Sequence, residues 1–516
     1  MKHLDYYLAE SKKAINTALF LLFLIALFTN TANAQTLKAG TGKSNITADC
    51  GNVHDSLFVK ALVLEGKHTN LAIITLDVVA IGTIGDVPNN FYPNIKNKLK
   101  KDLGISHVLV SASHNHYDGF LNGGGKLVEN IEEKTIEAVK EALTNMEKVK
   151  VGAGNGFENH ISMNRRIKLK DGSVFTIRHA NPNAPDDQIV GVGETDNEIG
   201  ILRIDRLNGT SKAVVYNFAC HPYTGVPGKG VTAEYPGFAS KEIEDNLGNG
   251  TMALFLQGAA GNITELFYKT VTEPRDCEPF GRMLGASTLK GFRRINTSKS
   301  VPFYVVSETI ALPLRTDISG QIKILETQEQ KLLASLRSTS LNMKTFLPLY
   351  IKYQLSPDYP SYYKYRYLQE EKEGQTGMKA LDIENRKNLD KYIQNMRAMD
   401  KLSQIEENIA FLKIRQSDID KNSSSTIKVD IEGIRIGDFI LVTFPGEPFA
   451  QIGLNIKEKS PFPNTFLAGY SNGYIHYAPT ADSYKEWGYE VMNSLLSPEW
   501  QQIYEDKVNE IIEKLK

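Results

Sequence analysis

The feature that most limits how this chain can fold is the alternation of short apolar runs with amphipathic stretches between Leu37 and about Leu314. The apolar runs are rich in β-branched residues and bounded by Gly, Asn or Asp, which is typical of buried strands. The stretches between them have the charge and spacing of helices. Alternating strands and helices predict an α/β fold with a largely parallel or mixed sheet.

The expected elements can be placed by residue number. The strand candidates are 58–64, 71–78, 107–111, 214–218, 252–256, 303–312 and 439–444. The helix candidates are 94–103, 128–146 and 499–515.

Composition changes near Thr316, where two stretches rich in Leu, Lys, Glu, Gln and Asn take helical spacing, 322–336 and 380–415. A tyrosine-rich segment lies between them. We therefore predict a helical insertion over residues 316–420, ended by the polar linker 421–425. The tyrosines either cover a helix pair, as aromatic residues at helical spacing usually do, or belong to a lid near a functional site.

The first 34 residues have the pattern of a secretory signal peptide. Lys12 and Lys13 precede an apolar run over 18–28, and Ala32-Asn33-Ala34 forms a small-x-small cleavage site. An uncleaved N-terminal anchor is the alternative. Cleavage would leave residues 35–516 as an exported protein, periplasmic or extracellular.

Overall charge and cysteine content exclude some classes of protein. The chain has 59 basic and 60 acidic residues and a formal charge of −1. It lacks the basic excess that holds a nucleic-acid backbone, so we expect no nucleic-acid partner. Three cysteines allow at most one bridge, for which Cys50 and Cys277 are candidates, so apolar burial must hold the core.

Two histidines follow the strand candidate at 107–111. Alternate residues of an extended chain point to the same side, so His114 and His116 should project together. Open α/β sheets bind ligands beyond the carboxyl ends of their strands. The pair is either half of a metal site, or one ligand beside one acid/base, or two polar histidines without a chemical role.

Three other segments offer similar side chains after apolar runs. His221 ends the run at 214–218, Glu447 follows a Pro-Gly turn after 439–444, and His476 and Tyr477 lie in an aromatic loop. His221 could instead be a strand-end histidine bonded to a backbone carbonyl, and Glu447 could be a helix N-terminal carboxylate stabilised by the helix dipole. Two histidines and one glutamate nevertheless form a normal catalytic zinc donor set that leaves room for water.

Two further segments could stabilise negative charge. The small residues at 258–262 would let backbone N–H groups approach an oxyanion, or would simply form a tight turn. Arg165 is either a fixed cation at a site or a surface residue.

Seven short motifs follow one another along the chain. They are His114-x-His116, Asn164-Arg165, Cys220-His221-Pro222, 231–237, Gly258-Ala259-Ala260-Gly261-Asn262, Phe444-Pro445-Gly446-Glu447 and Tyr474-Ile475-His476-Tyr477. In this order they resemble the motifs of the neutral/alkaline non-lysosomal ceramidase family, and the resemblance covers roughly residues 37–315 and 430–490.

The resemblance implies a secreted zinc-dependent amidase that cleaves the N-acyl bond of ceramide through a zinc-bound water. It implies that one Zn²⁺ is coordinated by His114, His221, Glu447 and Tyr477. His116 and Arg165 would then line the reaction centre and stabilise transition-state charge. Thr264 stands where the family has an active-site serine, and it keeps the hydroxyl donor.

Some features depart from the family pattern. Tyr117 replaces a serine after the second histidine, the insertion has no clear counterpart, and no segment matches the family's immunoglobulin-like C-terminal domain. Three functions therefore stay open: an amidase acting on ceramide or a related N-acylated lipid, a zinc hydrolase of another amide or ester, and a non-catalytic binding protein. The expected partners are a small-molecule or lipid amide and, transiently, a membrane surface.

Overall fold

The computed structural model describes residues 34–47, 52–119, 127–177, 184, 186–266, 275–355 and 364–516. Residues 1–33 of the expected signal peptide, and Cys50, lie outside the described residues. The chain divides into two compact units, one formed by 1–314 with 424–516 and the other by 315–423. Within the described part of the chain, no helix combines the length and apolar character needed to cross a bilayer.

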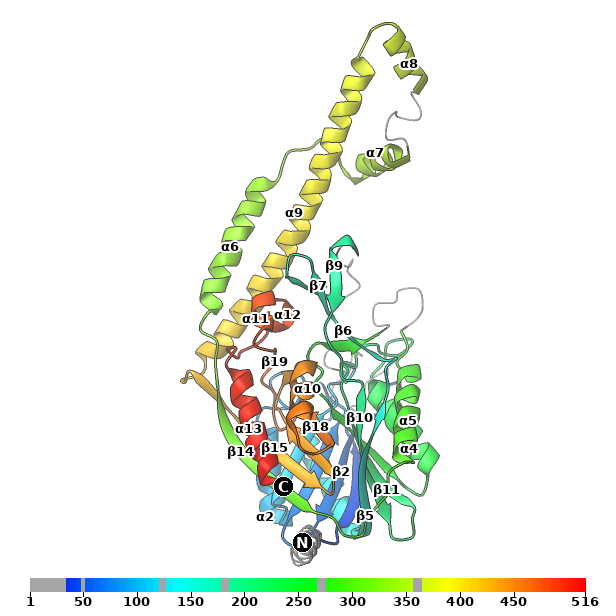
Figure 1. Ribbon diagram of the computed structural model, residues 1–516, viewed down its shortest axis with the longest axis vertical. Helices are drawn as coiled ribbons and strands as arrows, with labels where there is room; N and C mark the ends of the chain where they lie inside the picture. The colour runs from blue at the N-terminus through cyan, green and yellow to red at the C-terminus, as the bar shows by residue number, and fades with distance from the viewer. Residues whose placement is uncertain are drawn as a thin grey trace, which may run out of the picture. The chain divides into compact units, whose positions relative to one another are not determined.

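The larger unit contains an eight-stranded mixed sheet in the order β12-β11-β10-β5-β1-β2-β3-β4 (Figure 1). Pairs β3/β4 and β11/β12 are parallel and the other neighbours are antiparallel. Its strands are β1 (Lys38–Asn45), β2 (Phe58–Glu65), β3 (Asn70–Leu76), β4 (His107–Ala112), β5 (Glu147–Phe157), β10 (Glu198–Arg206), β11 (Ser211–Phe218) and β12 (Met252–Gln257).

A second sheet of four strands, in the order β14-β15-β16-β18, packs on the first. Its members are β14 (Phe303–Pro313), β15 (Thr426–Ile436), β16 (Phe439–Thr443) and β18 (Asn464–Ala468). Only β16 and β18 run parallel among them. Apolar side chains such as Leu202 of the first sheet and Phe466 of the second share one buried core.

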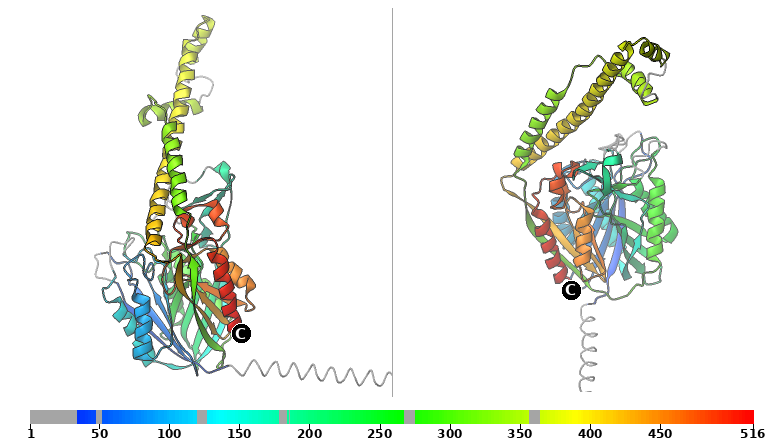
Figure 2. Two further views of the ribbon diagram at one scale, coloured as in Figure 1. Left: turned by 90° about the vertical axis from the view of Figure 1, so that its left-hand side faces the viewer. Right: turned by 45° about the horizontal axis from the view of Figure 1, so that its top comes forward.

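Helices cover the outer faces of both sheets, giving four layers (Figure 2). The eight-stranded sheet is covered by α2 (Phe91–Leu103), α3 (Ile131–Thr144), α4 (Glu234–Leu247) and α5 (Glu278–Phe292). The four-stranded sheet is covered by α10 (Ala450–Lys459) and α13 (Trp500–Lys514). Every residue of β11 is buried, as expected for a strand covered on both faces. The predicted α/β fold with a mixed sheet is confirmed.

Short strands and helices connect these layers near the strand ends. Two-stranded ladders pair β6 (Ser162–Asn164) with β13 (Ile263–Glu265) and β17 (Glu447–Pro448) with β19 (Tyr477–Ala478). A three-stranded sheet contains β7 (Arg166–Leu169), β8 (Val174–Thr176) and β9 (Ile189–Val192). The short helices are η1 (Asp186–Gln188), α11 (Ser483–Glu486) and α12 (Tyr489–Met492).

The smaller unit is the helical insertion. It contains α6 (Ile318–Ser335), α7 (Met343–Leu355), α8 (Lys364–Lys372) and the long α9 (Gly377–Asp420), on which the other three helices pack. Tyr353 is buried with Phe346 against Leu389, and Tyr367 is buried with its hydroxyl on the Met378 carbonyl at 2.9 Å. These two tyrosines cover helices, whereas Tyr350 and Tyr365 are exposed.

Candidate metal centre

The predicted ligands follow the carboxyl ends of parallel strands. His114 comes after β4, His221 after β11, and Glu447 after β16. Each of these strands has a parallel neighbour joined to it through a crossover helix, namely α2, α4 or α10. This is where open α/β sheets place their ligands.

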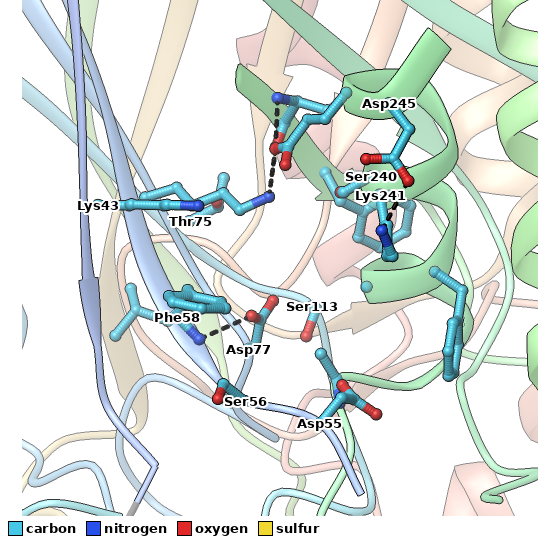
Figure 3. A pocket seen from close by; sticks show the side chains of 18 residues that line it. Lys43, Asp55, Ser56, Phe58, Thr75, Asp77, Ser113, Ser240, Lys241 and Asp245 are labelled. Atoms are coloured by element: carbon cyan, nitrogen blue, oxygen red, sulfur yellow. Dashed lines mark hydrogen bonds and ion pairs between the residues drawn. The ribbon is translucent and has the colours of Figure 1, made fainter. Parts of the chain in front are cut away.

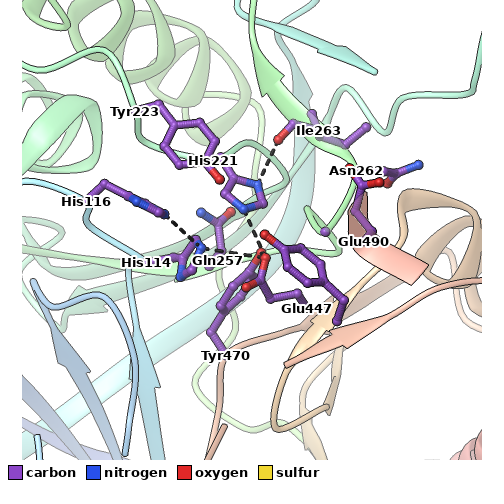
Figure 4. A network of polar contacts seen from close by, with 12 residues as sticks. His114, His116, His221, Tyr223, Gln257, Asn262, Ile263, Glu447, Tyr470 and Glu490 are labelled. Atoms are coloured by element: carbon purple, nitrogen blue, oxygen red, sulfur yellow. Dashed lines mark hydrogen bonds and ion pairs between the residues drawn. The ribbon is translucent and has the colours of Figure 1, made fainter. Parts of the chain in front are cut away.

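The three side chains meet at one point. His221 Nε2 lies 3.0 Å from Glu447 Oε2, and His114 Nε2 lies 3.7 Å from the same oxygen (Figure 4). All three residues are at most 1% exposed. The convergence of side chains from three strand ends gives the geometry of a metal site.

Backbone carbonyls fix the tautomer of both imidazoles. His114 Nδ1 lies 2.7 Å from the Val79 carbonyl, and His221 Nδ1 lies 2.8 Å from the Ile263 carbonyl. A carbonyl only accepts, so each ring carries its proton on Nδ1 and turns a bare Nε2 toward Glu447. Carbonyls that orient ligating imidazoles in this way are the usual outer shell of a metal site.

Burial keeps these histidines neutral. It lowers the pKa of His114 to about 3 and holds the pKa of His116 and His221 well below the usual histidine range. Neutral imidazole is the form that binds metal. A bare Nε2 and a carboxylate oxygen in contact are two acceptors, and a cation between them satisfies both, so the donor set fits a divalent metal.

His116 lies next to His114. Its Nε2 lies 3.1 Å from His114 Nε2, and its ring packs edge-on against Tyr223 with centroids 4.2 Å apart. Ring nitrogens of His114, His116 and His221 all lie within 4.8 Å of one another, so this group could hold a metal ion. The position suits both a ligand and the predicted acid/base.

Two tyrosines and a backbone carbonyl hold Glu447. The Tyr474 hydroxyl donates to Glu447 Oε1, and the Tyr470 hydroxyl donates to Oε2 at 3.3 Å. The Glu447 N–H donates to the His476 carbonyl at 2.9 Å. His476 therefore contributes its backbone here. These contacts leave the carboxylate little freedom to rotate.

Tyr477 and Arg165 adjoin the carboxylate. Tyr477 is the register partner of Glu447 in the β17–β19 ladder. Arg165 Nη2 donates to the Tyr477 hydroxyl at 3.1 Å and to the Gly261 carbonyl at 2.8 Å, and Nη1 donates to the Tyr223 hydroxyl at 2.8 Å. Arg165 is thus a buried cation at the site, and the surface alternative is wrong.

Glu490 is the counter-charge of Arg165. Arg165 Nε donates to Glu490 Oε1 at 2.8 Å, and Arg166 Nη1 donates to Oε2 at 2.9 Å. Burial alone would raise the pKa of the Glu490 carboxyl, but Arg165 and Arg166 outweigh it and hold that pKa below its ordinary value. The guanidinium of Arg165 is therefore fixed in place by an ionised partner.

Thr264 lies on β13, directly after the residue whose carbonyl holds His221. Its hydroxyl is buried and has no hydrogen-bond partner among the described residues. No described contact joins it to the histidines, so its catalytic role stays a prediction. A buried hydroxyl without a partner is what a site for a polar ligand group would offer.

The small-residue turn at 258–262 is mainly a packing device. The N–H groups of Gly258 and Gly261 donate to the Phe218 and Pro448 carbonyls at 2.8 and 2.9 Å. A side chain at Gly261 would begin 2.3 Å from the Glu447 carbonyl oxygen. Glycine there allows the close approach that positions Glu447, and these two N–H groups are not available to an oxyanion.

Some site residues were not found from the sequence. Gln257 Nε2 donates to the carbonyls of Ser113 and Cys220, at 3.1 and 2.7 Å, and so ties together the residues that precede His114 and His221. The sequence signal for Gln257 is a polar residue at the end of an apolar strand, and the signal for Tyr223 is its place two residues after His221. Glu490, in the short helix α12, has no local sequence signal.

A separate cavity of about 360 Å³ lies on the α4 side of β2 and β3 (Figure 3). Asp77 and Ser113 face it, and the Ser113 hydroxyl is buried with no hydrogen-bond partner among the described residues. Its described lining includes none of the predicted ligands, so this cavity is distinct from the histidine cluster.

Known proteins share the fold of this chain. No family model matches the chain. A 68-residue segment, 12% of this chain and 11% of the relative, is 34% identical to a neutral ceramidase of Mycobacterium tuberculosis. The crystal structure of the neutral ceramidase from Pseudomonas aeruginosa matches 93% of this chain and 74% of its own, with 16% identity and a TM-score of 0.55.

The chain has the neutral ceramidase fold. A second solved structure, a ceramidase complexed with C2, gives the same result at 14% identity, with a TM-score of 0.56 over 93% of this chain and 75% of that one. The ceramidase resemblance inferred from seven short motifs is thereby confirmed at the level of the fold. The curated relative matches over only about a tenth of its own length, so its activity enters below as a proposal.

Proposed function

We propose that the protein is an exported, zinc-dependent amidase that hydrolyses the N-acyl bond of ceramide or a related N-acylated lipid. The observation that carries the proposal is the contact of two neutral imidazole Nε2 atoms with one carboxylate oxygen at the strand ends of a ceramidase fold. His114, His221 and Glu447, with Tyr477 beside them, are the residues that would hold the metal. Nitrogen and oxygen donors of this kind suit Zn²⁺.

When bound, zinc supplies Lewis acidity that polarises the amide carbonyl and lowers the pKa of water toward ~7. The protein supplies the orientation of the donors. Carbonyls of Val79 and Ile263 hold the imidazoles, and Tyr470 and Tyr474 hold the carboxylate. Donors fixed before substrate arrives need no reorganisation during the reaction.

His116 is the residue placed to move a proton. It is neutral because burial lowers its pKa, and it is less buried than His114 and His221. In amide hydrolysis the carbonyl carbon gains the oxygen of water, the C–N bond breaks and the amine leaves with a proton. His116 would take the proton from water and return it to the amine nitrogen.

Arg165 and Thr264 would stabilise the charge that develops on the carbonyl oxygen. Arg165 is a permanent cation held by Glu490, and it donates a hydrogen bond to the Tyr477 hydroxyl, whose pKa burial holds well above its ordinary value. The partnerless hydroxyl of Thr264 is a donor that needs no existing bond to break. Loss of one such donor typically raises a barrier by ~2.7–4 kcal/mol.

Metal analysis combined with an N-acyl substrate panel tests the proposal. Purified protein should contain about one zinc per chain and hydrolyse short-acyl ceramide faster than simple N-acyl amino compounds. Glu447→Ala should lose both metal and activity, whereas Glu458→Ala, at an exposed position on α10, should lose neither. Turnover only of water-soluble amides or esters would reject the lipid substrate, and metal-free protein with full activity would reject the zinc chemistry.

A further inference from the structure

Helix α7 of the insertion is apolar on two faces. Phe346 and Tyr353 are buried against Leu389 of α9, which accounts for one face. The other face is exposed although it carries large apolar side chains at four-residue intervals: Met343, Leu347, Ile351 and Leu355, exposed by 57, 46, 48 and 77%. A helix that is apolar nearly all round is expected to be covered on both sides.

Other helices of the insertion also carry exposed apolar side chains. Tyr365 and Leu368 of α8 and Leu381 of α9 are each more than half exposed. α8 is joined to the start of α9, because the Tyr367 hydroxyl donates to the Met378 carbonyl. Figures 1 and 2 show α7 and α8 along the same half of α9. Large apolar side chains that gather exposed on one helix face, as on α7, mark an interaction site rather than ordinary surface.

The charges on α7 itself are positive, whereas α8 also carries Glu370 and Glu371. Lys344 and Lys352 are the ionisable residues of α7 other than its tyrosines, and the helix has no acidic residue. Lys344 lies next to the apolar face in the helical projection. Long lysine side chains at the edge of an apolar helix face can extend to lipid head groups while their stems stay in the apolar layer.

The positive charge distinguishes between occupants. A second copy of this chain would pair the same face with itself in a twofold contact, which would bring the lysines of both copies together. Like charges in such a contact are repulsive. An anionic bilayer surface instead attracts the lysines and accepts the apolar side chains.

We propose that the α7 face formed by Met343, Leu347, Ile351 and Leu355 docks the insertion on an anionic lipid bilayer. The apolar side chains enter the boundary between head groups and acyl chains, and Lys344 contacts the lipid phosphates. This docking depends on the insertion alone and not on the amidase proposal, so failure of one leaves the other standing.

Vesicle sedimentation tests the docking. The full chain should sediment with vesicles of phosphatidylcholine and phosphatidylglycerol in equal parts, and much less with pure phosphatidylcholine. Leu347→Glu with Ile351→Glu should weaken binding about tenfold or more, because two apolar contacts become charges of the wrong sign. The matched control is Leu333→Glu with Ile414→Glu, at sites on α6 and α9 that are 52 and 49% exposed, and it should bind like the wild type.

A second readout does not depend on how the double variant folds. Leu347→Trp should shift its emission to shorter wavelength when the mixed vesicles are added, and Leu333→Trp should not. Equal binding by both double variants, or a tryptophan shift at both positions, would overturn the proposal. Light scattering that shows a dimer broken by Leu347→Glu would also overturn it, because the occupant would then be a second copy.

Discussion

Nε2 of His221 faces Oε2 of Glu447 at 3.0 Å, although the two residues are 226 positions apart in the chain. The Ile263 carbonyl binds the opposite nitrogen of the ring, so His221 offers a lone pair to an atom that is itself an acceptor. This contact is stable only with a proton or a metal ion between the two atoms. Burial disfavours the imidazolium, and a divalent cation between the two atoms would satisfy both acceptors.

Metal binding should therefore stabilise the fold and depend on this pair. Zinc added at a thousand times its Kd should raise the free energy of unfolding by about 4 kcal/mol. Thermal unfolding with and without a chelator measures the effect. Glu447→Ala and His221→Ala should show no zinc-dependent shift, while Glu458→Ala keeps it. A full shift in Glu447→Ala would remove that residue from the ligand set.

His116 can be assigned as acid/base or as ligand by one substitution. His116→Ala should keep its zinc by elemental analysis and lose turnover by ~10²–10⁴-fold, the usual range for a positioned proton-transfer group. His160→Ala, at a histidine whose side chain is 74% exposed, is the control. Loss of metal along with activity would make His116 a ligand, and full activity would reject the acid/base role.

The ion pair between Arg165 and Glu490 should matter for stability as well as for the site. Glu490→Gln leaves the buried guanidinium without its ionised partner and should lower the free energy of unfolding by ~3–5 kcal/mol. Glu486→Gln removes a partly exposed partner of Arg166 and should cost no more than ~1 kcal/mol. Denaturant unfolding of both variants checks this, and equal small losses would contradict it.

Thr264 tests the role of a hydroxyl without a partner. Thr264→Val keeps the shape and removes the hydroxyl, so stability should be unchanged or slightly higher, because no hydrogen bond is lost. The value of kcat should fall by ~10²–10³-fold if the hydroxyl stabilises the oxyanion. Thr264→Ser should retain most activity. Valine and serine variants with equal kcat would show that the hydroxyl takes no part.

The raised pKa of Asp77, which lies away from the histidines, should make the stability of the fold depend on pH. Burial raises the pKa of its carboxyl from 3.8 to about 6, against a smaller opposing effect of Lys60. Between these values the folded chain holds a proton that the unfolded chain has released, so stability falls as pH rises, by up to ~3 kcal/mol.

Asp77→Asn keeps an acceptor for the Phe58 N–H and should remove that fall. The variant should therefore match the wild type near pH 4 and exceed it above pH 6 in urea unfolding. Asp245→Asn, at an exposed position on the same cavity, should follow the wild-type curve. If the free energy of unfolding of Asp77→Asn and of the wild type changed with pH in parallel, the raised pKa of Asp77 would be refuted.

The strands that the sequence predicted well are those with continuous apolar runs. β3, β4, β11 and β12 are buried along nearly their whole length. A strand buried on both faces needs apolar residues at almost every position, and this continuous apolar run is visible in the sequence. β1 and β5 were missed because they contain glycines. A side chain at Gly40 of β1 would begin 1.9 Å from the Ala142 carbonyl oxygen of α3, so close helix packing there requires glycine and removes the apolar signal.

At the site, the sequence identified residues that follow strand ends, because such positions have a local pattern. His114, His221 and Glu447 were found in this way, and the structure brings them together. Glu490 and Tyr470 act through contacts with residues more than 20 positions away, at 325 positions for Arg165 and 23 for Glu447. Pairings of that kind follow from how the two sheets and the final short helices pack, which one sequence does not encode locally.

The insertion leaves and re-enters the four-stranded sheet at a single point. β14 and β15 pair antiparallel without interruption from Phe303 opposite Ile436 to Pro313 opposite Thr426. The end of β14 therefore lies opposite the start of β15, as in a β-hairpin. Residues 315–423 take the place of that hairpin's turn. The length or content of residues 315–423 could therefore change in evolution without altering the register of the two strands that carry them.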